Sequence, residues 1–340
     1  MPPTVEEISA QLTRLVRAKT GDAQAAVREI SPLPGHAGFG YSFILDRATA
    51  GGPRGKLVLR VAPEGVRIAG PADVIRQAKI MQSLAGTEVP VPPIIWYGDE
   101  AEFFGRPYFV DGFLEGFRLA DNPPISRDDA RALARKAIAK LAALHRVDWK
   151  ARREAWGDPT PLSDEMKRLD HLLDRPTLDP AVVARGPELR AKLYSSLPEN
   201  PRVGCVHGDF QWSNIMFNNG AVAALIDWEI ALCGPTLLDV GWICFFSDPA
   251  SFHGANDANR VAPLSADEIV AAYAAVAGFP VSADEVRWFR AFAGYRFGVI
   301  TCFNLMLHRR GKRDDPHWEE IALSAPTMFS HGLELLGQGA

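Results

Sequence analysis

Residues 203–229 read VGCVHGDFQWSNIMFNNGAVAALIDWE, two short apolar segments that carry several polar residues and are joined by a tight turn. Asp209 follows the apolar segment Val-Gly-Cys-Val, Asn214 comes five residues later, and Asp227 ends a second apolar run. The turn at 218–220, Asn-Asn-Gly, is typical of a hairpin between two strands. A hairpin centred there brings Asn214 and Asp227 toward the same end. Carboxylates at the ends of buried strands need a compensating partner.

The polar side chains of this stretch suit a magnesium-dependent phosphoryl transfer. Mg²⁺ prefers oxygen ligands and is usually held by one or two carboxylates together with substrate phosphates, which favours Asn214 and Asp227 as ligands. Asp209 is then placed to orient an attacking hydroxyl and to accept its proton. For either aspartate alone, a turn cap is the better interpretation. The joint pattern has few accidental matches and favours catalysis.

The composition excludes several classes of protein. The chain has 340 residues, of which 47% are hydrophobic and 23% charged, with a formal net charge of -4. A nucleic-acid binder usually shows a basic excess, and this chain has none. No run of about 18 apolar residues predicts a membrane span, and the N-terminus lacks the apolar core of a signal peptide. We therefore expect a cytoplasmic protein without a nucleic-acid or membrane partner; its oligomeric state is not readable.

The four cysteines support the same location. They are Cys205, Cys233, Cys244 and Cys302, and none forms a CxxC or zinc-type spacing. Their number is too low for a disulfide scaffold. The simplest interpretation is four free, mostly buried thiols in a reducing compartment.

Residues 1–111 are predicted to form a small lobe with an antiparallel sheet and one packed helix. The capping box Thr4-Val-Glu-Glu7 opens a first helix, and residues 71–85 have a second helical pattern. Glycine-bounded apolar runs predict the strands. They are YSFIL (41–45), GKLVLRVAP (55–63), the end of VPVPPIIWYGD (89–99) and GRPYFVDGFLEG (105–116).

Residues 112–340 are predicted to be mainly helical. Ser126 caps a helix with an apolar face, and the sequence SADE occurs as a cap at 265–268 and again at 282–285. The exception is the hairpin at 203–229. His145, at the end of a predicted helix, is interpreted as a structural cap, and the aromatic residues from Trp242 onward as core with some lining a substrate pocket.

At this point the sequence resembles a known family. VHGDFQWSNIMF followed by LIDWE is similar to the paired signature of the aminoglycoside phosphotransferase and choline kinase family. LAALHRVDW (141–149) and GPTLLDVGW (234–242) are similar to further segments of that family, and the resemblance extends over about residues 30–300. It is nearest to the kinase-like branch associated with acyl-CoA dehydrogenases. The resemblance implies an α+β, bilobal protein-kinase-like fold with a small antiparallel-sheet N-lobe and a mainly helical C-lobe.

The resemblance also implies roles for residues of the helical lobe. Asp209 would be the catalytic base, and His207 would support its loop through hydrogen bonds. Asn214 and Asp227 would hold Mg²⁺. Asp239 would anchor the catalytic loop.

Further roles follow for the small lobe, which would bind ATP or GTP. Arg60 takes the place of the phosphate-binding lysine, and Gln77 that of its helix glutamate. A neutral glutamine can bond Arg60 but cannot neutralise it, although arginine remains a good phosphate partner. Lys56, on the same strand, is better interpreted as a solvated strand end.

Two backbone segments complete the predicted nucleotide site. The glycines of Gly35-x-x-Gly38-x-Gly40 would cover the phosphates with backbone N–H groups, although three glycines alone also fit a flexible turn. The segment of Asp111, Gly112 and Leu114 would meet the adenine.

The resulting prediction is transfer of the γ-phosphoryl group to a hydroxyl of a small molecule. The basic run at 308–315 is usually a solvated helix end, but near an acceptor it would favour an anionic alcohol, such as a hydroxyacyl-CoA, over a polycationic aminoglycoside. A nucleotide-binding pseudokinase acting as a binding module is the alternative that Gln77 and the unusual glycine loop leave open. A protein kinase is disfavoured because GPTLLDVGW follows Asp227 almost at once.

Overall fold

The computed structural model describes residues 4–33, 39–46, 55–65, 67–254 and 262–337. The chain forms two compact units, the first made of residues 1–116 and 223–231 and the second of residues 117–222 and 232–340. The predicted division at residue 111 stays a prediction. Within the described residues, no helix is long and apolar enough to cross a membrane.

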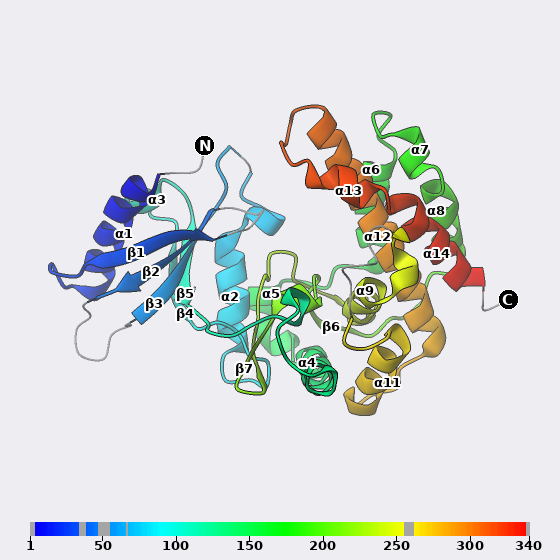
Figure 1. The fold of residues 1–340 in the computed structure, drawn as a ribbon, viewed down its shortest axis with the longest axis horizontal. Coiled ribbons are helices and arrows are strands. Elements are labelled where there is room, and N and C mark those ends of the chain that lie inside the picture. The colour runs from blue at the N-terminus through cyan, green and yellow to red at the C-terminus, as the bar shows by residue number, and fades with distance from the viewer. Residues whose placement is uncertain (1–3, 34–38, 47–54, 66, 255–261, 338–340) are drawn as a thin grey trace. The chain divides into compact units, whose positions relative to one another are not determined.

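A five-stranded antiparallel sheet forms the centre of the first unit, with strand order β1-β2-β3-β5-β4 (Figure 1). Its strands are β1 (Val27–Leu33), β2 (Phe39–Leu45), β3 (Gly55–Val61), β4 (Ile94–Gly98) and β5 (Tyr108–Gly112). Its helices are α1 (Val5–Thr20), α2 (Val74–Leu84) and α3 (Ala101–Phe104), with a 3-10 turn at Gly70–Ala72. The strands predicted at 41–45 and 55–63 are present as β2 and β3, which pair antiparallel as expected, whereas β1 was not predicted.

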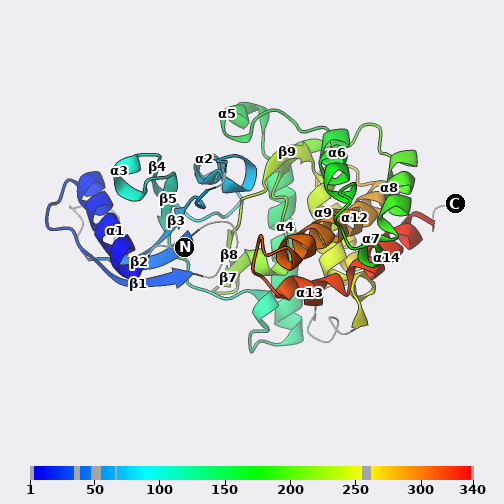
Figure 2. The same ribbon diagram turned by 90° about the horizontal axis from the view of Figure 1, so that it is seen from above.

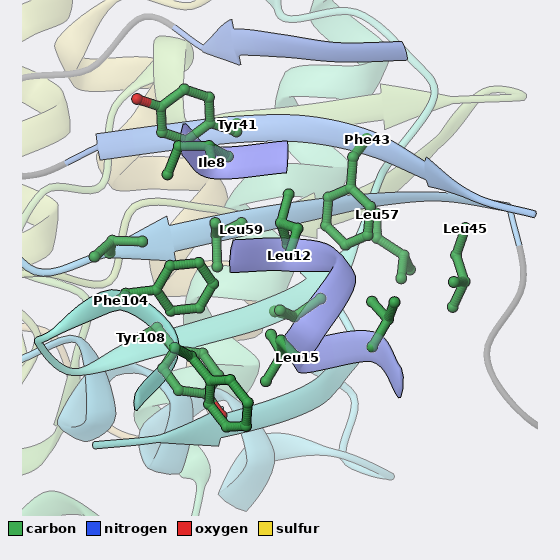
Figure 3. Packing of buried hydrophobic residues seen from close by; sticks show 14 of the residues in the cluster. Ile8, Leu12, Leu15, Tyr41, Phe43, Leu45, Leu57, Leu59, Phe104 and Tyr108 are labelled. Carbon is green, nitrogen blue, oxygen red and sulfur yellow. The ribbon is translucent and has the colours of Figure 1, made fainter. Parts of the chain in front are cut away.

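Helix α1 covers one face of this sheet. The predicted capping box is present, since the Thr4 side chain accepts from the Glu7 N–H and the Glu7 side chain accepts from the Thr4 N–H. Ile8, Leu12 and Leu15 are buried and point into a cluster of strand side chains (Figure 3). Because side chains alternate along a strand, β3 and β5 send their intervening side chains to the opposite face. Helix α2 contacts β4 and β5.

The second unit is mainly helical, as predicted. Its helices are α4 (Arg127–Arg146), α5 (Arg153–Trp156), α6 (Leu162–Leu173), α7 (Pro180–Val183), α8 (Gly186–Ser195), α9 (Leu237–Ser247), α11 (Ala266–Val276), α12 (Ala283–Arg309), α13 (His317–Ala322) and α14 (Ala325–Gly337). Short 3-10 turns lie at Leu119–Asp121, Lys150–Arg152, Trp212–Asn214 and Pro249–Ser251. The long α12 packs against α6, α8, α9 and α14 (Figure 2).

Two short strand pairs lie in and beside the segment 203–229. Strand β6 (Val203–Val206) pairs antiparallel with β9 (Leu232–Pro235), and β7 (Ile215–Asn218) pairs with β8 (Ala221–Leu225). The second pair is the predicted hairpin, and its turn has left-handed backbone at Asn219 and Gly220. The Lys136 ammonium of α4 donates to the Gly220 carbonyl at 2.6 Å.

Helices α9 and α12 approach unusually closely at Gly241. A Cβ atom at this position would lie 2.4 Å from the backbone oxygen of Phe289, which real Cβ atoms do not tolerate. Glycine therefore permits this helix contact. The next residue of α9 is Trp242, and Arg296 lies two turns beyond Phe289 on α12.

All four cysteines are free and buried, which agrees with their interpretation from spacing.

Candidate active site

The Asp209 carboxylate in the second unit is held by three side-chain N–H donors. Trp242 Nε1 donates to Oδ1 at 2.7 Å and Gln211 Nε2 donates to the same oxygen at 2.9 Å. Asn214 Nδ2 donates to Oδ2 at 2.8 Å. All three donors are neutral, so they orient the carboxylate without neutralising its charge. A carboxylate held in a fixed orientation is the arrangement that a base for an attacking hydroxyl requires.

The loop that carries Asp209 is anchored by the fully buried Asp239 of α9. Its Oδ2 accepts from the His207 N–H at 2.8 Å, and its Oδ1 from the Gly208 N–H at 2.7 Å. Gly208 has a φ of 85°, a left-handed conformation that glycine adopts without steric cost. His207 Nδ1 in turn lies 3.3 Å from the Asp209 backbone nitrogen and accepts its N–H. His207 and Asp239 thus both make hydrogen bonds to the backbone of this loop, while their roles in catalysis stay predictions.

His145 is part of this anchor and is not a helix cap. The buried imidazole lies 3.1 Å from Asp239 Oδ2 through Nε2 and 2.6 Å from the Tyr273 hydroxyl through Nδ1. The cap interpretation was wrong because both partners of His145 are distant in sequence. The imidazole on α4 thus contacts both α9 and α11, and it supports the loop through Asp239.

The two predicted metal ligands flank the β7–β8 hairpin. Asn214 directly precedes β7, and Asp227 follows β8 by two residues. Because the Asn214 amide nitrogen is used on Asp209, the amide presents its oxygen elsewhere. Asp227 belongs to the first unit, where it is exposed and has a φ of 67°. Oxygen donors of this kind fit Mg²⁺.

Arg76 of α2 holds the segment that follows Asp227. Its guanidinium donates to the Ala231 carbonyl and, at 3.4 Å, to the Glu229 carbonyl. Burial lowers the pKa of this arginine, an effect that Asp73 opposes. Left-handed backbone at a non-glycine residue is strained and persists only when its surroundings fix it, and such strain is often found at functional sites. Arg76 supplies part of that support.

An acidic residue lies near Arg60 on the neighbouring strand. Asp111 of β5 lies on the same face of the sheet as Arg60 and is buried. Burial raises the pKa of Asp111 to about 7, against the lowering effect of the Arg60 charge. Asp111 Oδ1 has no hydrogen-bond partner among the described residues. An acid therefore lies beside Arg60 on β5, and not at the helix position of Gln77.

Gly40 lies beside Arg60, whereas Gln77 makes its hydrogen bond to another part of the chain. Gly40 is opposite Arg60 in the sheet, and a Cβ added there would lie 3.1 Å from a guanidinium nitrogen of Arg60. The Gln77 amide is buried and donates to the Pro71 carbonyl at 2.9 Å. Its hydrogen bond is therefore used within the α2 region. Gly38 and Gly35 of the predicted nucleotide loop lie outside the described residues.

The segment predicted to meet the adenine follows Asp111 on β5. The Gly112 N–H donates to the Pro93 carbonyl at 3.0 Å, and the Phe113 N–H donates to the Lys56 carbonyl at 3.2 Å. These two N–H groups are thus already hydrogen-bonded to carbonyls of the protein. Leu114 is the residue that follows Phe113. The Lys56 ammonium is exposed over the Phe113 ring, 3.9 Å from its centroid. This agrees with its interpretation as a strand end.

Four polar residues at these positions were missed or misread from the sequence. Gln211 and Trp242 bind Asp209, Arg296 donates to the Gly208 carbonyl, and Arg76 binds the segment after Asp227. Gln211 had a usable signal, since it lies inside the D-x4-N motif. The other three contact residues at least 33 positions away, which no local pattern reports.

Comparison with known proteins decides the family. Residues 46–289, well over half of the chain, match the sequence model of the phosphotransferase enzyme family. The chain belongs to the phosphotransferase enzyme family. This assignment makes it a small-molecule kinase by class.

The curated relatives of this phosphotransferase are longer proteins. Acyl-CoA dehydrogenase family member 10 of Mus musculus is 25% identical over 259 residues, covering 72% of this chain and 24% of that protein. Family member 11 of Gallus gallus is 25% identical over 294 residues, covering 82% of this chain and 37% of that protein. The phosphotransferase chain therefore spans about a quarter to a third of these relatives. The predicted resemblance to the acyl-CoA-dehydrogenase-associated branch is confirmed.

Solved structures show the fold of the phosphotransferase. A putative aminoglycoside phosphotransferase from Ralstonia eutropha is 20% identical with a TM-score of 0.78, covering 97% of this chain and 98% of that one. A thermostable mutant of the aminoglycoside phosphotransferase APH(4)-Ia, solved with ADP and hygromycin B, is 17% identical with a TM-score of 0.62, covering 97% of this chain and 99% of that one. The predicted α+β, bilobal protein-kinase-like fold is confirmed.

Proposed function

We propose that this phosphotransferase moves the γ-phosphoryl group of ATP, or of GTP, to a hydroxyl of a small molecule. The observation that carries the proposal is the Asp209 carboxylate, which three neutral donors hold on a loop fixed by Asp239. Phosphoryl transfer needs mainly positioning and neutralisation of charge, with a base that orients the nucleophile. A carboxylate that is fixed before any ligand arrives suits that task.

The proposed roles divide between charge neutralisation and proton transfer. Mg²⁺, held by Asn214 and Asp227 with the phosphates, would neutralise the charge that develops on them. Arg60 would bind the α- and β-phosphates, because a guanidinium forms bidentate bonds to phosphate oxygens. Asp209 would accept the proton of the attacking hydroxyl. The O–P bond to the acceptor then forms as the bond between the γ-phosphorus and the leaving nucleotide breaks.

The acceptor would be an alcohol with an apolar body. Trp242, which bonds Asp209, lies 5.0 Å from Phe246 and 5.8 Å from Phe297 between ring centroids. Both phenylalanines are only half-buried and belong to a larger aromatic cluster. The guanidinium of Arg296 lies 4.6 Å from the Trp242 ring. A polycation needs acidic side chains, and aromatic rings beside a buried arginine do not supply them.

An anionic alcohol such as a hydroxyacyl-CoA meets these conditions. The curated relatives carry names of acyl-CoA dehydrogenases, which supports an acyl-linked acceptor. The basic run at 308–315 offers less unpaired positive charge to an acceptor than its composition indicates. Arg309 is paired with Asp179 and Glu319, and Arg313 donates to the Asn304 side chain. The aromatic surroundings of Trp242 therefore carry the choice of acceptor.

Calorimetric titration tests the nucleotide site. ATP and GTP are titrated with and without Mg²⁺ into the wild type and into Asp227→Ala. We expect magnesium-dependent binding in the wild type and loss of its magnesium-dependent part in the variant, because Asp227 is the proposed carboxylate ligand. Asp121→Ala is the control, since Asp121 pairs with the nearby Arg118 on the surface. Equal binding by Asp227→Ala and the control would remove Asp227 from the metal site.

Acceptor screening tests the transfer itself. Hydroxyacyl thioesters, free hydroxy acids, aryl alcohols and aminoglycosides are offered with MgATP, and phosphorylated product is measured. The proposal expects product from the first three classes before the last. A wild type that binds MgATP and phosphorylates nothing, water included, would instead be the nucleotide-binding pseudokinase.

A further inference from the structure

The three donors to Asp209 differ in what they attach it to. Gln211 and Asn214 lie on the same loop as Asp209, so they can move together with it. Trp242 belongs to α9, and its 2.7 Å bond is the shortest of the three. The indole is almost fully buried. Of these three donors, Trp242 is therefore the one that fixes the carboxylate relative to the helical core.

The same bonds distinguish the two carboxylate oxygens. Among the described residues, Oδ1 accepts from both Trp242 and Gln211, while Oδ2 accepts from one side chain, that of Asn214. A carboxylate oxygen has about two lone-pair positions. Two donors therefore saturate Oδ1, and Oδ2 retains a position for the proton of the acceptor hydroxyl.

A buried cation lies against the indole. Arg296 is 3% exposed, its guanidinium is 4.6 Å from the Trp242 ring centroid, and one nitrogen donates to the Gly208 carbonyl at 3.1 Å. Its Nε has no hydrogen-bond partner among the described residues. Burying a charge so incompletely bonded is costly, so such a residue needs a reason to be there.

We propose that Trp242 is a positioning residue for the base, which turns Oδ2 of Asp209 toward the acceptor, and that Arg296 strengthens this action. The role rests on the proposed phosphoryl transfer. A cation over an aromatic ring attracts the π electrons and leaves the indole N–H a better donor. Arg296 also fixes Gly208, the residue before Asp209. Arg296 thereby restrains the main chain next to Asp209 directly, and it restrains the Asp209 side chain through Trp242.

The test compares two tryptophan variants. Trp242→Phe removes the indole N–H and keeps an aromatic ring. Trp288→Phe is the matched control, because Trp288 is equally buried and donates its Nε1–H to the Leu193 carbonyl at 3.1 Å. For each protein, kcat and KM for MgATP are measured with the best acceptor of the screen, or with water as the acceptor by release of inorganic phosphate.

We expect Trp242→Phe to lower kcat roughly tenfold to a hundredfold with KM for MgATP unchanged, because misplacement of a base affects the chemical step and not nucleotide binding. Trp288→Phe should keep the wild-type kcat. Equal kcat values for the two variants would overturn the role of Trp242 and leave the proposed function standing. A wild type without turnover would overturn both.

Arg296→Met tests the second half of the proposal. If Arg296 acts largely through Trp242, the double variant with Trp242→Phe loses less kcat than the product of the two single losses. Fully multiplicative losses would contradict the coupling.

A measurement on Asp209→Asn covers the case in which Trp242→Phe does not fold. In protein labelled with ¹⁵N-tryptophan, the substitution should move one indole N–H resonance upfield, since a neutral amide is a weaker acceptor than a carboxylate. If every indole resonance keeps its wild-type position, the bond to Asp209 is absent in solution and the proposal fails.

Discussion

The acidic residues at the catalytic loop of the second unit differ in hydrogen bonding from the acid on the Arg60 face, which is the face of the first unit's sheet that carries Arg60 and Asp111. Asp239 accepts from two backbone N–H groups and contacts His145, and Asp209 accepts from three neutral side-chain donors. Asp111, by contrast, is buried beside Arg60 with one oxygen that lacks a hydrogen bond among the described residues. The carboxylates of Asp239 and Asp209 therefore have hydrogen-bond donors without any ligand. On the Arg60 face, by contrast, an Asp111 oxygen still lacks a donor, which a ligand could supply.

Removal of the loop anchor should have the largest effect on stability. Asp239→Ala leaves the His207 and Gly208 N–H groups buried without their acceptor, and we expect a loss of about 3–5 kcal/mol in the free energy of unfolding. Urea denaturation measures it. Asp121→Ala, which removes only a surface ion pair, should cost no more than about 1 kcal/mol. Similar losses in the two variants would show that Asp239 stabilises the fold no more than a surface ion pair does.

The pH dependence of stability tests the Arg60 face. The folded pKa of Asp111, about 7, lies above the ordinary value of 3.8, so the folded state retains a proton that the unfolded state has lost. Stability from this group is therefore present below about pH 4 and falls as the pH rises through 7, by at most about 4 kcal/mol.

Asp111→Asn removes that ionisation. The variant should gain stability relative to the wild type as the pH rises from 4 to 8, which thermal or urea melts at several pH values would measure. A constant difference between the two proteins across this range would mean that Asp111 is ionised in the folded protein throughout, with Arg60 compensating it fully.

A smaller effect is expected where the first unit holds the segment after Asp227. Arg76→Gln loses the bonds to the Glu229 and Ala231 carbonyls and should cost about 1–2 kcal/mol in stability. It should also weaken the magnesium-dependent part of ATP binding, because the backbone that follows Asp227 is released. Calorimetry and urea denaturation measure the two effects.

The matched control is Arg17→Gln in the same unit. The Arg17 guanidinium also donates to a backbone carbonyl, that of Ala25, at 3.1 Å, but far along the chain from Asp227. Its loss should leave magnesium-dependent binding unchanged. If both variants bind MgATP alike, Arg76 has only a structural role.

Patterns within a few residues of the chain were enough to predict much of the fold. The cap at Thr4, the caps at Ser265 and Ser282, and the hairpin turn at Asn219 and Gly220 are each fixed by local hydrogen bonds or backbone preferences. The D-x4-N motif likewise reports a local geometry, since Asn214 bonds Asp209 directly.

Features that depend on distant partners were not predictable. Strand β1 has no clean alternation because its register shifts between Arg28 and Ser31. His145 could not be recognised as a partner of Asp239, which lies 94 residues away. The placement of Asp111 on the same sheet face as Arg60 depends on the order of strands in the sheet, which places β5 beside β3.

Binding and transfer measured on one pair of proteins decide whether Asp209 is the base. Wild type and Asp209→Ala are compared for MgATP affinity by calorimetry and for phosphoryl transfer to the best acceptor. If Asp209 is the base, the variant binds MgATP almost as tightly as the wild type and transfers no measurable phosphate. Transfer at a rate near that of the wild type would contradict the assignment of Asp209 and, with it, the mechanism proposed for this site.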